Sequence, residues 1–107
     1  MDNWRIPHLL KLLEDDSENE FVLFALAQEY SKVGNLTDSL KYYQALKQKN
    51  ENYVGLYYHL AALYAELDEY DKALSTYETG IAIAKKLQDH HALSELMNAK
   101  TNLEMEL

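Results

Sequence analysis

The sequence predicts an all-α fold of short antiparallel helix pairs, and three observations support this prediction. Its 107 residues include three glycines and one proline, too few chain breakers for the many turns of an all-β protein. Apolar residues recur at the three- and four-residue spacings of a helical face. Two stretches, 26–43 and 60–77, repeat the same leucine, alanine and tyrosine positions at an offset of 34. We expect residues 1–107 to form a single domain with one modest core.

The first two helices are predicted from leucine periodicity and from their end signals. A helix is expected over residues 7–14, because proline suits the first helical position and leucines follow at helical spacing. Ser17 and Glu20 stand three apart, which predicts a capping box. The second helix is predicted over residues 20–33, and Gly34 follows as a C-terminal glycine.

Asparagines precede the next two helices. The third helix is predicted over residues 36–49 with Asn35 as its N-cap, because an asparagine side chain accepts hydrogen bonds from the first helical turn. The fourth is predicted over residues 53–67 with Asn52 as its N-cap.

The last two helices follow the same logic. The fifth is predicted from about Glu69 to Leu87. Asp68 stands where Gly34 stood in the first copy, although aspartate adopts the left-handed conformation less readily than glycine. Asp89 is the predicted N-cap of a sixth helix that runs toward the end of the sequence.

The repeated positions lie where two packed helices meet, and they resemble the tetratricopeptide repeat, a helix–turn–helix unit with a 34-residue period. The resemblance implies a right-handed superhelix of antiparallel helix pairs, in a small stand-alone protein of bacterial type. It implies repeat units at 20–53 and 54–87, with capping helices at 1–19 and 88–107. The matched positions are Leu26/Leu60, Ala27/Ala61, Tyr30/Tyr64, Leu40/Leu74 and Tyr43/Tyr77.

Two departures from the family pattern concern the end of the second unit and the capping helix that follows it. Lys85 stands where the family carries proline, and we interpret this as an elongated helix before a terminal cap. Met97 occupies a position where the family carries a small residue. A large side chain there suggests that no further helix packs closely against the last one.

Charge and composition exclude several classes of function. The net charge of −8 repels phosphate backbones and anionic lipid, so neither nucleic acid nor a membrane is expected as a partner. A partner with a basic or neutral segment is compatible with it. The absence of cysteine excludes disulfides and thiolate metal sites and fits the cytoplasm. The amphipathic start is not expected to be a signal peptide.

The resemblance also implies a concave groove lined by the first helix of each unit, where partner peptides bind. Phe21, Phe24 and Tyr58 would form an aromatic anchor there, unless a terminal helix covers them. The expected function is therefore a non-catalytic interaction module or scaffold. The alternative is self-assembly into a homodimer through exposed aromatics, Trp4 included. The predicted groove positions are Phe21, Phe24, Gln28, Ser31 and Lys32 in the first unit and Tyr58, His59, Ala62, Ala65 and Glu66 in the second.

One subfamily of this fold binds a C-terminal carboxylate with groove lysine, arginine and asparagine side chains. The matching positions here are Phe24, Gln28 and His59. An acidic C-terminal tail is therefore not expected as the ligand.

A metal-dependent enzyme is the third hypothesis. Asp89, His90, His91 and Glu95 are close in sequence, and His91 and Glu95 share a helical face. Two such ligands fall short of the three that a catalytic zinc site needs. His59 has no nucleophile or carboxylate at a useful helical spacing, and the glycines are isolated. We expect neither enzymatic activity nor a metal or other cofactor.

Overall fold

The computed structural model describes residues 3–107, which form six α-helices and no strand, so the all-α fold class is confirmed. The chain divides into two compact units, one ending at Glu51 and the other spanning Asn52–Leu107. Residues 1–2 of the predicted N-terminal capping segment lie outside the described residues.

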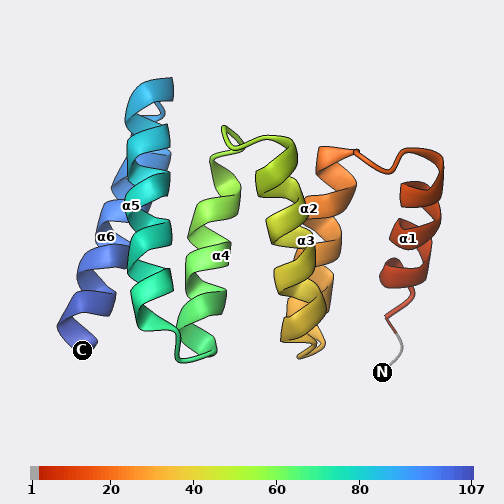
Figure 1. Cartoon of the computed structure of the whole chain (residues 1–107), viewed down its shortest axis with the longest axis horizontal. Helices are drawn as coiled ribbons and strands as arrows, with labels where there is room; N and C mark the ends of the chain where they lie inside the picture. The colour runs from red at the N-terminus through yellow and green to blue at the C-terminus, as the bar shows by residue number, and fades with distance from the viewer. Residues whose placement is uncertain (1–2) are drawn as a thin grey trace. The chain divides into compact units, whose positions relative to one another are not determined.

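Unit 1 contains α1 (Arg5–Asp15), α2 (Glu20–Lys32) and α3 (Leu36–Lys49). Successive helices run in opposite directions, and α2 packs against both α1 and α3 (Figure 1). The apolar stripe of each helix faces this packing, which removes it from water. The apolar core residues of unit 1 are Leu9, Val22, Leu23, Leu26, Ala27, Tyr42, Tyr43 and Leu46.

The caps of unit 1 confirm one sequence prediction and correct another. Asn35 accepts a hydrogen bond from the backbone N–H of Asp38 at 3.1 Å, as predicted for an N-cap. The capping box of Ser17 and Glu20 is wrong, because Asn19 is the N-cap of α2 and accepts from the N–H of Val22. Glu20 is then the first helical residue, two positions before the third helical position from which a glutamate reaches back to the N-cap.

Unit 1 also buries a carboxylate. Glu29 of α2 is almost fully buried. Its Oε1 lies 3.4 Å from Nη1 of Arg5 and 3.5 Å from Nζ of Lys32. The Asn3 side-chain amide donates to Glu29 at 3.2 Å. Burial by itself raises the pKa of Glu29, but the Asn3 hydrogen bond and the two cations outweigh it and lower the pKa below 4.5. These contacts fix the start of α1 against α2.

Unit 2 contains α4 (Gly55–Glu66), α5 (Tyr70–Leu87) and α6 (His90–Glu106). Helix α5 packs against both α4 and α6 (Figure 1). Helix α4 also contacts α6. The elongated fifth helix is as predicted. The apolar core residues of unit 2 are Leu56, Tyr57, Leu60, Ala61, Leu63, Ala73, Tyr77, Ala84, Leu96 and Leu103.

The helix ends of unit 2 again divide into confirmed and corrected predictions. Asp68 adopts the left-handed conformation at φ 60°, in the place of Gly34 at φ 81°. Asp89 accepts from the N–H of Ala92 at 3.0 Å, so it is the N-cap of α6. Asn52 does not cap α4, which starts after Val54 without a side-chain cap. The Asn52 side chain instead accepts a hydrogen bond from Lys86 Nζ at 3.1 Å.

Close approach of helices in unit 2 depends on Gly80 of α5. A Cβ added at this position would lie 2.6 Å from Cβ of Tyr57 and 3.2 Å from Cδ1 of Leu96. Atoms cannot approach that closely, so α4, α5 and α6 keep their spacing only because glycine has no side chain. This contact sets the distance between the helices that build the candidate site.

Candidate functional site

A hollow of unit 2 lies beside α4, α5 and α6, and we call it the tyrosine pocket. Its volume is about 490 Å³. Predicted groove residues Tyr58, Ala62, Ala65 and Glu66 form its α4 side. The full lining is Tyr58, Ala62, Ala65, Glu66, Tyr70, Tyr77, Ala99, Asn102, Leu103 and Glu106.

Helical geometry explains why these residues meet. On α4 the lining positions 58, 62, 65 and 66 fall on one face, and on α6 the positions 99, 102, 103 and 106 do the same. The small side chains of Ala62 and Ala65 on α4 and of Ala99 on α6 leave space that larger side chains would fill. The site is therefore built on rigid helices rather than on loops.

Three tyrosines converge on the pocket with different exposure. Tyr58 is 42% and Tyr70 38% exposed, whereas Tyr77 is buried. Burial raises the pKa of Tyr77, and the nearby Tyr58 hydroxyl raises it further. The Tyr70 hydroxyl donates to Asp68 Oδ1 at 2.9 Å, and this hydrogen bond raises the pKa of Tyr70. Tyr70 and Tyr77 thus present neutral phenols at physiological pH.

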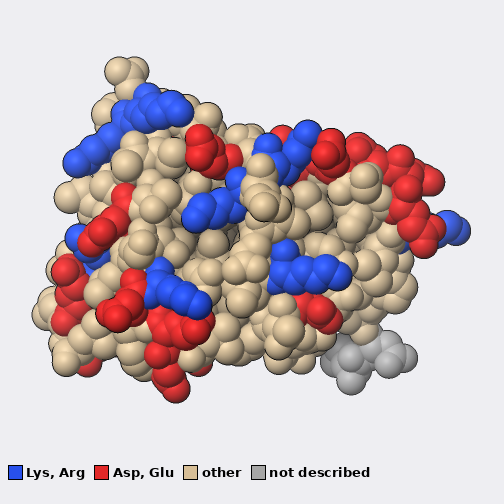
Figure 2. All heavy atoms as spheres, viewed as in Figure 1, with Lys and Arg blue, Asp and Glu red and all other residues tan. Residues whose placement is uncertain are grey.

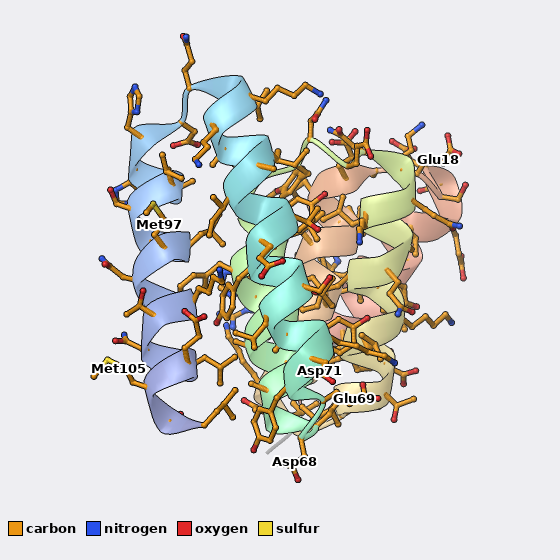
Figure 3. The ribbon with its side chains drawn as sticks, turned by 60° about the vertical axis from the view of Figure 1, so that its left-hand side comes forward. Glu18, Asp68, Glu69, Asp71, Met97 and Met105 are labelled. Atoms are coloured by element: carbon orange, nitrogen blue, oxygen red, sulfur yellow. The ribbon has the colours of Figure 1, made fainter. Side chains whose placement is uncertain are left out.

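The charge at the pocket is negative. Glu66 and Glu106 line it, and Glu106 lies close enough to contribute to the raised pKa of Tyr70. Beside the Tyr70 end of the pocket, the turn between α4 and α5 carries the carboxylates of Asp68 and Glu69, and the first turn of α5 carries that of Asp71 (Figure 3). Acidic side chains gather over this turn in the space-filling view (Figure 2).

The neighbouring cations are engaged elsewhere. Lys100 of α6 pairs with Glu78 at 3.5 Å. Lys72 pairs with Glu69 at 3.3 Å and lies over the ring of Tyr64. Neither side chain lines the tyrosine pocket.

A second, smaller hollow surrounds His59, and we call it the His59 pocket. It has a volume of about 210 Å³ and shares Tyr58 with the tyrosine pocket. The Tyr58 and His59 rings meet edge to face, with centroids 5.5 Å apart. Burial lowers the pKa of His59, and Glu95 opposes this shift only in part. The imidazole is therefore neutral at pH 7.

The groove positions predicted in unit 1 have different environments. Phe21 is 71% exposed. Phe24 is half-buried and its ring meets the edge of Tyr43, at a centroid distance of 6.1 Å. Gln28 is half-buried, and Lys32 forms an ion pair with Glu29. Of the two predicted aromatic residues in unit 1, Phe21 is therefore the one whose ring is exposed to solvent.

Sequence reasoning missed the walls that α5 and α6 contribute, including Tyr70, Tyr77 and Glu106. A signal was available, because the alanine, asparagine, leucine and glutamate of α6 recur at i, i+3, i+4 and i+7. Helix α6 does not cover Tyr58; it lies beside the ring as a second wall. Met97 is half-exposed on α6, and Met105 projects away from the other helices of unit 2 (Figure 3).

The sequence cluster at the start of α6 has a structural role. Asp89 caps the helix, and His91 Nε2 lies 3.2 Å from Glu95 Oε1 on the surface. Within residues 3–107 no three histidine, aspartate or glutamate side chains are grouped to hold a metal ion. Over the same residues, no helix has both the length and the apolar character required to span a bilayer.

Two solved structures from Salinibacter ruber are similar to this chain in both sequence and fold. The crystal structure of a tetratricopeptide repeat domain protein is 41% identical, covers 80% of this chain and 96% of its own, and superposes with a TM-score of 0.76. The solution structure of a tetratricopeptide repeat domain protein from the same organism is 42% identical. The match covers 83% of this chain and 90% of that protein, with a TM-score of 0.79.

More distant structures share the fold. The TPR2B domain of yeast Sti1, solved in complex with pHsp70, is 14% identical and covers 95% of this chain and 82% of its own, with a TM-score of 0.87. The MamA protein is 21% identical and covers 94% of this chain and 55% of its own, with a TM-score of 0.71. No protein-family model and no curated protein matches the sequence.

Proposed function

The chain belongs to the tetratricopeptide repeat family, and from this premise we propose that it is a non-catalytic module that binds a partner protein or peptide. The tyrosine pocket is the observation that carries the proposal. It places the predicted positions Tyr58, Ala62 and Glu66 around one hollow with partly exposed aromatic rings. Aromatic anchors in concave sites contribute a large share of binding energy at protein interfaces.

Precedent on the same fold supports a protein partner. The yeast Sti1 domain was solved in complex with pHsp70, and it matches the backbone of this chain over most of its length. We propose that this chain uses the α4 face in unit 2, with His59 beside Tyr58. In unit 1 we propose that Phe21, Phe24, Gln28 and Lys32 contribute.

The chemistry of the pocket supports binding rather than catalysis. Its polar groups are tyrosine hydroxyls, an asparagine amide and the two carboxylates of Glu66 and Glu106. The pKa values of Tyr70 and Tyr77 are raised, which makes their hydroxyls weak acids near neutral pH. The lining holds no serine, cysteine or lysine nucleophile paired with a base.

Affinity capture from the native cell tests this proposal. The bait is the wild-type chain, and Tyr58→Ala and Phe21→Ala remove the two rings that are most open in their units. Met105→Ala is the matched control, because it removes an 80% exposed apolar side chain outside the pocket. Circular dichroism establishes that each variant is folded. Capture that survives Tyr58→Ala and Phe21→Ala unchanged would contradict the proposal.

Self-assembly is the second candidate, and exposed apolar side chains favour it. Trp4, Phe21 and Met105 are each more than two-thirds exposed. Light scattering at two concentrations measures the mass in solution. A dimer that dissociates on Trp4→Ala or Tyr58→Ala would support assembly, whereas a monomer at both concentrations would exclude it.

A further inference from the structure

The tyrosine pocket has the chemistry of a cation site. Three tyrosine rings face a hollow that two glutamates border, and none of the ten lining residues is a lysine or arginine. Aromatic ring faces carry negative potential and attract ammonium and guanidinium groups. The two carboxylates add the opposite charge that such a group requires.

The negative charge of the pocket is not neutralised within the described chain. Glu66 and Glu106 make no ion pair within residues 3–107. Lys72 of α5 is paired with Glu69, and Lys100 of α6 is paired with Glu78. A positively charged ligand could therefore form ion pairs with the carboxylates of Glu66 and Glu106.

The shape of the pocket suits one long side chain. It is an open depression of about 490 Å³, which is large enough to receive one side chain of a bound segment. The methyl groups of Ala62, Ala65 and Ala99 provide an apolar wall for the methylene stem of lysine or arginine. The charged end would then lie among the rings of Tyr58 and Tyr70.

We propose that the tyrosine pocket receives a lysine or arginine side chain of the partner, so that the bound segment is basic. This inference rests on the proposed function and specifies its partner by charge. Residues 52–107 carry nine acidic and four basic side chains, which attract such a segment over a longer range. An acidic segment would meet repulsion from Glu66 and Glu106.

Titration with peptides of one charge type tests the inference. The probes are four blocked eight-residue peptides in which alanine alternates with lysine, arginine, glutamate or serine. Amide chemical shifts of the ¹⁵N-labelled full chain are followed at Ala62, Ala65, Ala99 and Asn102. We expect the lysine and arginine peptides to shift these amides at millimolar concentration, and the glutamate and serine peptides to leave them unchanged. Raising the salt concentration should weaken the binding.

Two double variants distinguish the effect of the pocket carboxylates on binding from the effect of the net charge of the chain. Glu66→Gln with Glu106→Gln removes both pocket carboxylates, while Glu14→Gln with Glu104→Gln makes the same change in net charge outside the pocket lining. Each pocket carboxylate is expected to contribute about threefold to affinity, so the first double variant should bind basic peptides about tenfold more weakly. The second should bind within about twofold of the wild type.

Three results would overturn the inference: equal weakening in both double variants, equal binding of the serine peptide, or no shift of these amides with any peptide. The proposed function is decided separately by the capture experiment with Tyr58→Ala. A partner that binds at Tyr58 through an acidic or uncharged segment would retain the function and reject the basic segment.

Discussion

Gly80 provides the sharpest test of the helix spacing on which the candidate site depends. In Gly80→Ala the new Cβ would lie 2.6 Å from Cβ of Tyr57, an atom fixed to the α4 backbone, and 3.1 Å from Cγ of the same ring. Overpacking of a tight core costs about 3 kcal/mol at the upper end of its usual range. Alanine recovers about 1 kcal/mol over glycine in a helix interior. We therefore expect a net loss of about 2 kcal/mol in the free energy of unfolding.

The control is Gly55→Ala, because the nearest side-chain atom to its new Cβ, Cε1 of Tyr53, is 3.9 Å away. We expect that variant to be about 0.5 kcal/mol more stable than the wild type, because alanine lowers the conformational entropy of the unfolded chain. Urea unfolding followed by circular dichroism measures both. If Gly80→Ala is as stable as Gly55→Ala, the close contact of α5 with Tyr57 does not constrain the helix spacing.

Two further predictions concern the pH dependence of stability. The pKa of Glu29 is lowered in the folded state, so its stabilisation is present above the unfolded value of 4.5 and is lost as the pH falls through the folded value. Glu29→Gln should therefore be about 1 kcal/mol less stable than the wild type at pH 7. Thermal unfolding should show that this difference in stability vanishes near pH 3. A difference that does not change with pH would contradict the prediction. Burial raises the pKa of Tyr43 from 10 to about 12, so its contribution is present below pH 10 and is lost as the pH rises toward 12. Tyr43→Phe should reduce the loss of stability between pH 8 and 12 by about 2 kcal/mol in urea unfolding, whereas parallel pH profiles for wild type and variant would contradict it.

Local signals predicted the helices and most of their ends. The apolar periodicity is a property of each helix alone, and Asn35 and Asp89 cap helices through contacts three residues away. Asp68 illustrates how position outweighs residue preference. The turn after α4 requires the left-handed conformation, and aspartate adopts it where the first copy uses glycine.

The failed predictions arose where a side chain had a choice of partners. Asn52 has the chemistry of an N-cap, but its side-chain oxygen accepts from Lys86, which lies 34 residues away. Tyr42 was not predicted to face inward, yet it is buried and its ring stacks on that of Tyr30, with centroids 5.7 Å apart. Periodicity within one helix does not reveal such contacts between helices.

The candidate site was predicted on α4 and missed on α5 and α6 for the same reason. Tyr58, Ala62 and Glu66 could be assigned because the repeat pattern fixes which face of α4 packs against α5. Tyr70 joins them through the packing of α5 against α4, and Glu106 joins them through the packing of α6 beside α4. The pattern within one helix does not show which neighbouring helix its side chains will meet.

The most direct test of the proposed function is the affinity of a captured partner for the wild type and for Tyr58→Ala, with Met105→Ala as the control. Isothermal titration of the purified proteins measures it. Loss of a central aromatic anchor should weaken binding by about thirtyfold, equivalent to about 2 kcal/mol. The control should match the wild type, since its side chain projects away from the pocket. Equal affinity of Tyr58→Ala and wild type would contradict partner binding at the tyrosine pocket.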